Sequence, residues 1–444
     1  MSTINLSTAV NHHYLDKVMK LTDVMDVAAS EDILDQRGMK LVAKGTRLTR
    51  AQQNTLGLHK LSKSLESTLV VEGAVDSGKI VACATRLIDT SAPLRLIIAN
   101  AGGGGPSPQA LLANMRFGHA MRMMLTLIER DGEASLDHSV MVSMLAICMA
   151  KKLKVSPEEQ MVAALAGLLH DIGELYIDPA YLNPGRRLLP HEWAHLVVHP
   201  RIGQMLIAEL ESYPASVGRA VAEHHERADA TGYPRQMGRK DLSPAGQAVS
   251  VAEMIAGVLQ LDHALERAEL ALKIVPGEHA RELLAGVSGA LRAQDKKQGE
   301  PPLAASKNEG IEHLFGRICL IIEAGEQLAS GAAAASPHAL ALLARSMERV
   351  RTVQRAFIST GLDFYMKQVH LLGDADGTML FEKAVATREI EWRLRDIARD
   401  LALNTSASPE EQAIFAGLIT MLDDTAANDA AAPPIKQGDE PQAA

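Results

Sequence analysis

The spacing of apolar and polar residues predicts helices over most of the chain after residue 109. Through 109–292 apolar residues recur every three or four positions, as on the buried face of a helix. The segment Ser156-Pro157-Glu158-Glu159 offers a capping hydroxyl, a proline suited to the first turn, and carboxylates near the positive helix end. The same Ser-Pro signal recurs at 336–337 and 408–409. Four further amphipathic helices are predicted at 311–331, 336–361, 380–404 and 409–424.

The first hundred residues follow a different pattern. Gly38 and Gly45 flank the alternating segment MKLVA, as in a hairpin, while 51–61 resembles a short helix and 65–75 a strand. We therefore expect a small α/β module over residues 1–100. The glycine-rich segment AGGGGPSP at 101–108 is expected to be a flexible break. It lacks the Gly-Lys-Ser/Thr ending of a phosphate-binding loop, so we interpret it as a linker.

The predicted fold class is mainly α: a helical domain over 109–292, preceded by this module and followed by a C-terminal helical region over 311–424. The polar stretch 293–310 contains two prolines and is expected to be a linker. The Ala- and Pro-rich residues 425–444 are expected to be a disordered tail.

Composition narrows the function classes. Of the 444 residues, 47% are hydrophobic but only 3% aromatic, so the core must be built from Ala, Leu, Val, Ile and Met, which favour helices. The net charge of −9 argues against a nucleic-acid groove. Three widely separated cysteines suit a reducing compartment. Without a signal-peptide pattern or an apolar run of about 18 residues, we expect a cytoplasmic chain with no membrane span.

Histidine is concentrated in one short part of the chain. Six of the sixteen histidines lie between positions 170 and 225, which is about an eighth of the length. Imidazole nitrogens and carboxylate oxygens together suit Zn, Mn or Fe, whereas a structural zinc site usually recruits cysteine. Two ions a few ångströms apart can activate one water and neutralise the charge that builds on a phosphoryl group.

Several of these polar residues interrupt apolar helical segments, so each would be costly to bury without a partner. Taken alone, His138 reads as a hydrogen-bonded core histidine and Glu253 as a partly exposed helix carboxylate. His191 and His195 share a helix face with His199, and we interpret them as surface or supporting groups. The pairs His170-Asp171 and His224-His225 are harder to explain without a metal.

Four segments carry a family resemblance: HSVMVSMLAICMAKKLKVSPEE, LLHDIGELYIDP, EWAHLVVHPRIG and AEHHERADATGYP. Together they resemble the HD-GYP subgroup of HD-domain phosphohydrolases over about residues 115–262. The resemblance implies a helical bundle that hydrolyses the bacterial messenger cyclic di-GMP at a metal centre. It implies two divalent transition-metal ions, with Fe or Mn expected and Zn, Ni or Co as alternatives.

Mapped onto this chain, the resemblance implies catalytic roles for Asp171, His170 and His224, with Asp171 bridging the two metals. It implies a substrate-side loop shaped by Gly232, Tyr233 and Pro234 and supported by Arg227 and Asp229. The implied metal ligands are His138, His170, Asp171, His199, His224, His225 and Glu253.

The chain departs from the usual motif at several positions. Glu174 stands where the family has a phosphate-holding lysine, and Glu253 stands where it has an aspartate. Ala134 takes the place of a glutamate that holds a third metal in some members. The Arg-rich segment that often follows Glu253 is missing. Candidate replacement cations, which could equally be ordinary solvated side chains, are Arg186, Arg187, Arg201, Arg235, Arg239 and Lys240.

Three functions remain open from the sequence. The first is a cyclic di-GMP phosphodiesterase. The second is a signalling module that keeps its metal, has lost efficient turnover because of Glu174, and acts through partner contacts. The third is a phosphohydrolase for another nucleotide. The C-terminal helices are candidates for homodimerisation or for binding a signalling partner.

Overall fold

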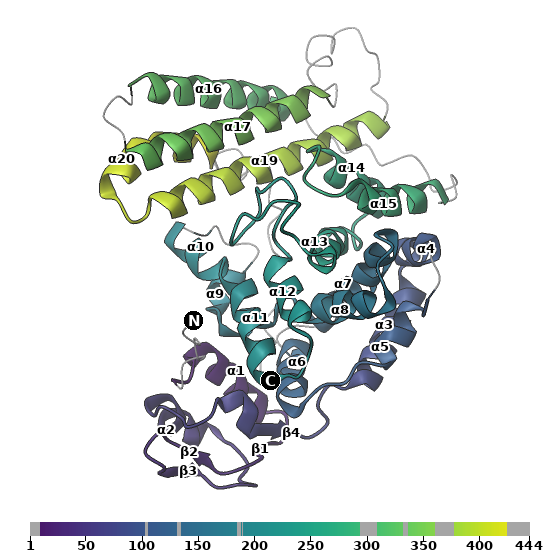
Figure 1. Cartoon of the computed structure of the whole chain (residues 1–444), viewed down its shortest axis with the longest axis vertical. Coiled ribbons are helices and arrows are strands. Elements are labelled where there is room, and N and C mark those ends of the chain that lie inside the picture. The colour runs from purple at the N-terminus through teal and green to yellow at the C-terminus, as the bar shows by residue number, and fades with distance from the viewer. Residues whose placement is uncertain are drawn as a thin grey trace, which may run out of the picture. The chain divides into compact units, whose positions relative to one another are not determined.

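The computed structural model describes residues 9–102, 105–130, 135–183, 188, 190–293, 309–331, 336–359 and 377–423, and they are mainly helical (Figure 1). The predicted fold class is confirmed. Contacts between residues divide the chain into two compact units. The first contains Met1–Ala304 with Asp376–Val385, and the second contains Ala305–Ala375 with Ala386–Ala444. The predicted module and the predicted helical domain both lie within the first unit.

The N-terminal part of the first unit contains two small antiparallel sheets. Strand β1 (Val27–Ala29) pairs with β4 (Leu69–Val71), and β2 (Ile33–Leu34) pairs with β3 (Lys40–Val42). Gly38 has φ +81°, a conformation that side chains rarely adopt, and turns the chain between β2 and β3 as the sequence predicts. The remaining elements here are α1 (His12–Thr22), η1 (Arg50–Gln52), α2 (Gln53–Leu58) and η2 (Leu65–Thr68).

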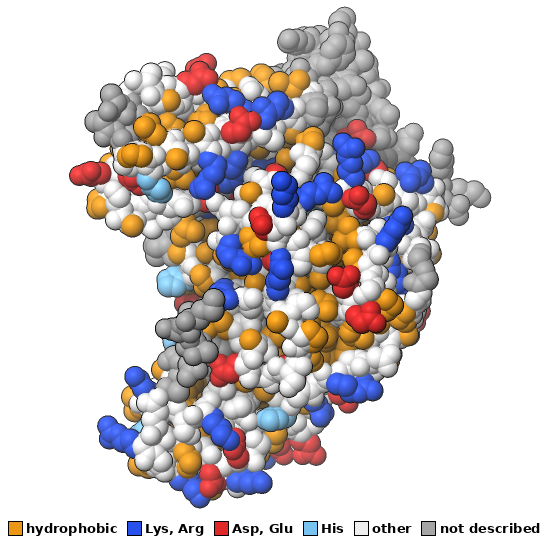
Figure 2. All heavy atoms as spheres, in the orientation of Figure 1, with side chains coloured by type: hydrophobic (Ala, Val, Ile, Leu, Met, Phe, Trp, Pro, Cys, Tyr) orange, Lys and Arg blue, Asp and Glu red, His pale blue; other side chains and the backbone are white. Residues whose placement is uncertain are grey.

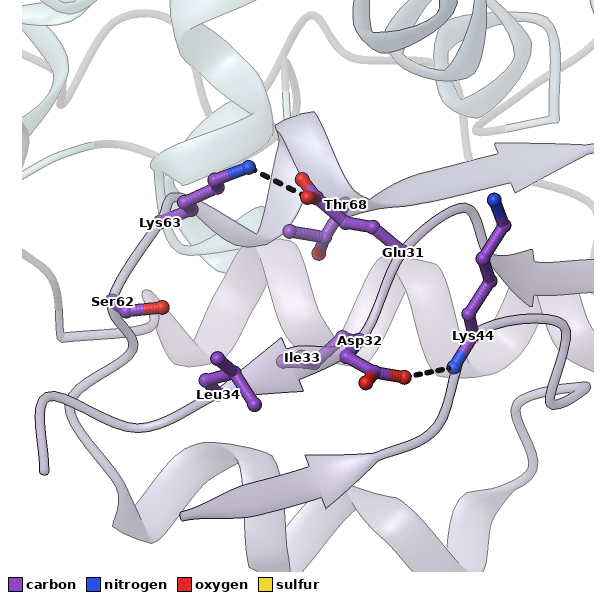
Figure 3. A pocket seen from close by; sticks show the side chains of 8 residues that line it. All are labelled: Glu31, Asp32, Ile33, Leu34, Lys44, Ser62, Lys63 and Thr68. Carbon is purple, nitrogen blue, oxygen red and sulfur yellow. Dashed lines mark hydrogen bonds and ion pairs between the residues drawn. The ribbon is translucent and has the colours of Figure 1, made fainter. Parts of the chain in front are cut away.

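A surface cavity of about 510 Å³ lies beside these strands (Figure 3). Two contacts order this lining: Lys63 pairs with Glu31 at 2.6 Å, and the Asp32 carboxylate accepts the Lys44 backbone N–H at 2.7 Å. None of the described residues that line this cavity is a histidine.

The helices that follow surround a tightly packed centre formed by α7 (Ser135–Lys152), α8 (Pro157–Leu169) and α13 (Pro244–Ala256). Gly167 explains part of this packing, because a Cβ there would lie 2.9 Å from Cα of Ser143. Helices α3 (Ser77–Thr90) and α4 (Ala92–Asn100) also pack on α7, although the sequence interpretation placed them in the N-terminal module. The other elements are α5 (Pro108–Ala113), α6 (His119–Arg130), η3 (Ile172–Tyr176), α9 (Pro179–Leu182), α10 (Pro190–Leu196), α11 (His199–Leu210), α12 (Ala215–Glu223), α14 (Ala264–Lys273) and α15 (Arg281–Ala293).

The second unit is helical, and its helices begin and end close to the predicted positions. They are α16 (Glu309–Gly331), α17 (Pro337–Ser359), α19 (Gly377–Thr405), which starts in the first unit, and α20 (Pro409–Leu422). Arg349 of α17 pairs with Asp396 at 2.6 Å and with Asp400 at 3.2 Å, both on α19. All three side chains are largely buried, so this network fixes the register of the two helices.

On the face shown in Figure 2, Lys and Arg side chains are interspersed with Asp and Glu side chains. Within the described helices, none is long and apolar enough to cross a membrane. The predicted tail and most of the predicted linker lie outside the described residues, as do Ala134, Arg186 and Arg187.

Candidate metal centre

The His170-Asp171 pair lies where α8 ends and η3 begins. Ser156 caps the start of α8, as the sequence predicts, and Glu159 completes a reciprocal capping box with it. His170 follows the last residue of α8 as its C-cap, and Asp171 is the N-cap of η3. The change from an α-helix to a tight 3-10 turn therefore places two adjacent side chains on one polar site inside an apolar bundle.

Three histidines are oriented by the same kind of hydrogen bond. The Nδ1 atom of each bonds a backbone carbonyl three residues earlier: His170 to Gly167 at 3.0 Å, His199 to Leu196 at 2.8 Å and His224 to Val221 at 2.6 Å. A carbonyl can only accept, so Nδ1 must carry the proton and Nε2 is left with its lone pair. This is the usual orientation of a metal-ligating histidine.

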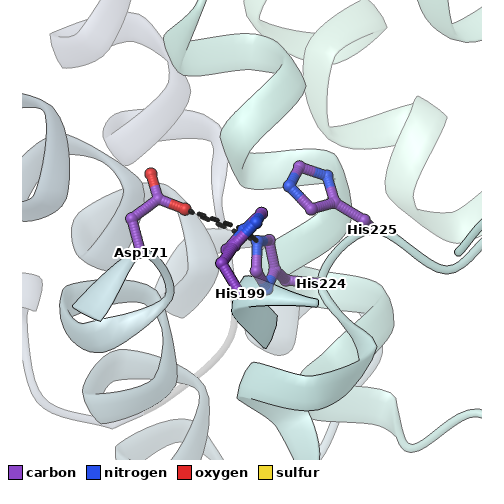
Figure 4. Close-up of side chains that lie close together, drawn as sticks. All are labelled: Asp171, His199, His224 and His225. Carbon is purple, nitrogen blue, oxygen red and sulfur yellow. Dashed lines mark hydrogen bonds and ion pairs between the residues drawn. The ribbon is translucent and has the colours of Figure 1, made fainter. Parts of the chain in front are cut away.

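The three Nε2 atoms converge on Asp171, and Figure 4 shows His199 and His224 approaching its carboxylate. One carboxylate oxygen lies 2.8 Å from Nε2 of His170, and the other lies 3.5 Å from that of His199 and 3.6 Å from that of His224. Two groups of potential ligand atoms result, each within 4.8 Å: His138, His170 and Asp171 in one, and Asp171, His199, His224 and His225 in the other. Asp171 belongs to both groups.

This donor set fits a metal for a reason visible in the structure. The buried Nε2 atom of His170 has no hydrogen-bond partner among the described residues, although Asp171 is near. The Nε2 atoms of His199 and His224 face each other at 3.2 Å, and both are buried. Two buried imidazole nitrogens at this distance need a proton or a metal ion between them, and a metal ion satisfies both at once.

Glu253 of α13 and His225 complete the other side of the cluster. The Glu253 carboxylate lies 3.7 Å from His225 Nδ1 and 3.9 Å from His224 Nε2. The His225 ring stacks on Tyr233 with centroids 4.5 Å apart, and Tyr233 meets Trp193 edge-on. The structure thus brings all seven predicted ligands into one region.

The charges of the site are strongly coupled. Burial alone would lower the pKa of His170, but the Asp171 carboxylate outweighs it and raises this pKa to about 9. Burial would raise the pKa of Asp171, yet the neighbouring histidines hold it well below its usual range. Burial, together with the charges of His224 and His199, lowers the pKa of His225 well below the ordinary value. A metal binds a neutral imidazole and an ionised carboxylate, so metal binding at this site must displace the proton that Asp171 stabilises on His170.

A cavity of about 480 Å³ opens beside His138 and Asp171. Its walls include Ile128, Leu175 and Leu261, and Glu174 also lines it. Burial and the adjacent Asp171 charge raise the pKa of Glu174 to about 8. Among the described residues that line this cavity there is no lysine or arginine.

The loop after α12 is built tightly around the two adjacent histidines. A Cβ on Gly232 would overlap the backbone of His225 and Glu226 and lie 2.5 Å from the Arg227 nitrogen, so only glycine fits there. Tyr233 donates its backbone N–H to the His225 carbonyl at 3.2 Å, and a cis peptide bond joins it to Pro234. Gly232 and Tyr233 therefore support His225 directly.

The predicted cationic contacts are placed differently from one another. Arg227 donates to the Ser250 hydroxyl at 2.5 Å and to the Glu226 carbonyl at 3.1 Å, so it ties the loop to α13. Arg235 and Arg201 have exposed side chains, and Arg201 bonds Gln204. Arg239 and Lys240 are also exposed, and Arg239 pairs with Glu282 at 3.7 Å.

Other residues named from the sequence lie outside the two ligand groups. Asp229 accepts the Thr231 hydroxyl at 2.7 Å within the loop. His195 is exposed and stacks on Tyr181 at 5.8 Å; it belongs to neither ligand group, in line with its interpretation as a surface residue. The position of the His191 side chain lies outside the described structure.

Sequence reasoning missed the buried Glu226. Its carboxylate accepts the backbone N–H groups of Arg235 at 2.7 Å and Met237 at 2.9 Å, and so closes the loop. The available signal was an acidic residue directly after two adjacent histidines. It also missed the three carbonyl partners of the histidines, which no side-chain pattern encodes.

Comparison with known proteins gives one matching family model, described as an HD domain, over residues 122–264. The chain is 32% identical over 121 residues to the cyclic di-GMP phosphodiesterase PA4108 of Pseudomonas aeruginosa, which covers 27% of this chain and 29% of that protein. It is 34% identical to the cyclic di-GMP phosphodiesterase response regulator RpfG of Xanthomonas campestris, over 29% of this chain and 34% of that one. A 3'3'-cGAMP-specific phosphodiesterase of Vibrio cholerae is 26% identical over 29% of this chain and 28% of its own.

The matched region spans about a third or less of the length of these curated relatives. Among solved structures, Bd1817, a HDG"Y"P protein from Bdellovibrio bacteriovorus, matches 49% of this chain and 70% of its own. The sequence identity is 21% and the TM-score 0.33.

Proposed function

Starting from an HD domain at residues 122–264 that is related to HD-GYP cyclic di-GMP phosphodiesterases, we propose that this chain is a metal-dependent phosphodiesterase acting on a cyclic dinucleotide. The observation that carries the proposal is the convergence of three oriented histidine Nε2 atoms on the single carboxylate of Asp171. Related proteins named for cyclic di-GMP and for 3'3'-cGAMP support the substrate class.

Each residue has a definite task in this proposal. Asp171 belongs to both ligand groups and can bridge two ions, with His138 and His170 on one side and His199, His224 and His225 on the other. Glu253 lies within reach of the second group. Bound divalent ions would supply Lewis acidity to the phosphoryl oxygens and lower the pKa of an attacking water. The ligand set suits Fe or Mn, because it is rich in imidazole and contains no thiolate.

The remaining residues hold the substrate and the ligands in place. The cavity beside Asp171 has apolar walls that suit a nucleobase or ribose, and Tyr233 presents an aromatic face against His225. Glu226 and Arg227 keep the Gly232-Tyr233-Pro234 turn closed over the two histidines. The leaving 3′-oxygen would take its proton from a histidine of the cluster or from water.

The test is a turnover assay on protein loaded anaerobically with Fe²⁺ or Mn²⁺. Cyclic di-GMP and 3'3'-cGAMP are incubated separately, and linear dinucleotide products are quantified by chromatography. Asp171→Asn is the matched variant, since it keeps the side-chain size but removes the bridging charge. Product formation by the wild type and its loss in Asp171→Asn are expected. Metal-loaded wild type that leaves both substrates intact over hours would refute catalysis.

One observation favours a second candidate. The described lining of the cavity carries Glu174 and no cation, although a substrate with two phosphates would be expected to need one. On this alternative the domain binds metal and nucleotide but signals through partner contacts instead of turnover. Tight cyclic di-GMP binding by calorimetry, without product formation, would identify it.

A further inference from the structure

The segment that follows Asp171, η3, packs against the N-terminal module. Tyr176 is the last residue of η3, five positions after Asp171, and its hydroxyl donates a hydrogen bond to Glu66 of η2. The Tyr176 ring stacks on Tyr14 of α1, with centroids 5.2 Å apart and planes at 18°. Asn11, the N-cap of α1, donates from Nδ2 to the Tyr176 carbonyl oxygen at 3.2 Å. Two elements of the module thus hold one residue of η3.

The 3-10 turn η3 also packs closely against α11, which begins at His199. A Cβ on Gly173 would overlap the His199 carbonyl oxygen and lie 3.0 Å from the Gly203 nitrogen. Ile172 is fully buried beside it. Any displacement of η3 therefore changes the position of Asp171 relative to His199. Metal ligands tolerate only a few tenths of an ångström of such change.

Stability alone is a poor explanation for the contact with the module. Glu66 is 7% exposed, and burying a carboxylate costs more than burying an apolar group of the same size. The Tyr14 hydroxyl is also buried and has no hydrogen-bond partner within the described part of the chain. An apolar contact between η2 and η3 would hold the two together at least as well. A directional hydrogen bond, by contrast, selects one arrangement of η3.

We propose that Tyr176 and Glu66 are positioning residues of the metal centre. Their hydrogen bond fixes η3 against α11, and η3 in turn fixes Asp171 between its histidines. The N-terminal module is then a working part of the metal site, 110 residues away in sequence. This inference rests on the metal-binding part of the proposed function.

The test measures Mn²⁺ affinity by competition with a chromophoric chelator, on the full chain. Tyr176→Phe and Glu66→Ala each remove the hydrogen bond and are expected to weaken Mn²⁺ binding about tenfold. Glu66→Gln keeps an acceptor for the hydroxyl and should stay within about twofold of the wild type. The double variant should be no weaker than either single one, because both remove the same contact.

Val42→Ala serves as the control for general destabilisation of the module. Val42 is 4% exposed in β3 and packs in the same core, so its truncation lowers the melting temperature without removing the Tyr176 contact. Its Mn²⁺ affinity should match that of the wild type. Should Glu66→Ala fail to fold, Tyr176→Phe, which lacks only one oxygen, decides the outcome.

The possible failures are distinguishable. If the wild type binds Mn²⁺ and Tyr176→Phe binds it equally well, the positioning role is overturned and the proposed function stands. An equal loss of affinity in Val42→Ala would also overturn it, since the effect would then be general. If the wild type binds no metal, the proposed function and this inference fall together.

Discussion

Replacing Gly173 by alanine is a sharp test of how η3 is seated. Gly173 is buried, and its missing side chain is what allows η3 to lie against the first turn of α11. An added Cβ would overlap the carbonyl oxygen of His199 and stand 2.9 Å from its carbonyl carbon and 3.0 Å from the Gly203 nitrogen. All three are backbone atoms, which cannot rotate out of the way as a side chain can.

The expected size of the effect follows from this geometry. Overpacking a core costs about 1–3 kcal/mol, and a clash with rigid backbone belongs at the upper end of that range. The lower backbone entropy of alanine returns about 0.5–1 kcal/mol. A net destabilisation of about 2 kcal/mol is therefore expected, which lowers the melting temperature of a unit of roughly 300 residues by about 3 °C. Because η3 and α11 must separate, Mn²⁺ affinity should also fall by about tenfold or more.

Thermal unfolding and chelator competition measure both effects on the same protein. Gly238→Ala is the matched control: nothing lies within 4 Å of the added Cβ, and Gly238 has no positive φ. It should leave the melting temperature and Mn²⁺ affinity unchanged. The reasoning is refuted if Gly173→Ala behaves like Gly238→Ala in both measurements.

Three further predictions concern single side chains. Glu174→Lys should lower KM for cyclic di-GMP about tenfold, because it places a cation beside the phosphate. Glu174→Gln is the uncharged control. A KM that stays unchanged in steady-state kinetics would exclude a phosphate near this position. Burial raises the pKa of Glu66 above the ordinary 4.5, so the folded state holds this proton more tightly than the unfolded state does. The bound proton therefore stabilises the fold fully below pH 4.5, and this contribution is lost as the pH rises through the folded-state pKa. Urea unfolding across that range should show wild-type stability falling relative to Glu66→Gln, and parallel curves would contradict the shift. Arg227→Met should lower the free energy of unfolding by about 1.5–3 kcal/mol through loss of its bonds to Ser250 and the loop carbonyl. Unaltered stability with loss of substrate binding would instead place Arg227 on the substrate.

Much of the architecture could be read from the sequence because the signals are local. The Ser-Pro start signals at 156, 336 and 408 each precede a helix, and the Ser156 hydroxyl caps α8 as predicted. Repeating apolar spacing predicted the helices of the second unit to within a few residues. The resemblance to HD-GYP proteins is confirmed by the family model and by the relatives, since it depended on closely spaced motifs.

Contacts between distant parts of the chain could not be predicted in the same way. Helices α3 and α4 carry no mark that they pack on α7 and not within the N-terminal module. The bond between Tyr176 and Glu66 joins residues from separate elements. Tyr176 lies in the segment LLHDIGELYIDP, but nothing in the sequence pairs it with Glu66. The backbone carbonyls that orient the three histidines are present at every residue. Only the fold determines which of them are used.

The ligand assignment stays a prediction, although the structure brings the residues together. The structure also shows that Glu253 is not an ordinary surface carboxylate, because its side chain lies near both His224 and His225. We expect the number of bound metals to depend on Asp171, because its carboxylate belongs to both ligand groups.

Elemental analysis of the wild-type chain, purified anaerobically and compared with Asp171→Asn, tests the central claim most directly. The account predicts about two Fe or Mn ions per wild-type chain and a marked loss in the variant. Wild-type protein that contains no transition metal and takes up none when titrated with Mn²⁺ would contradict it.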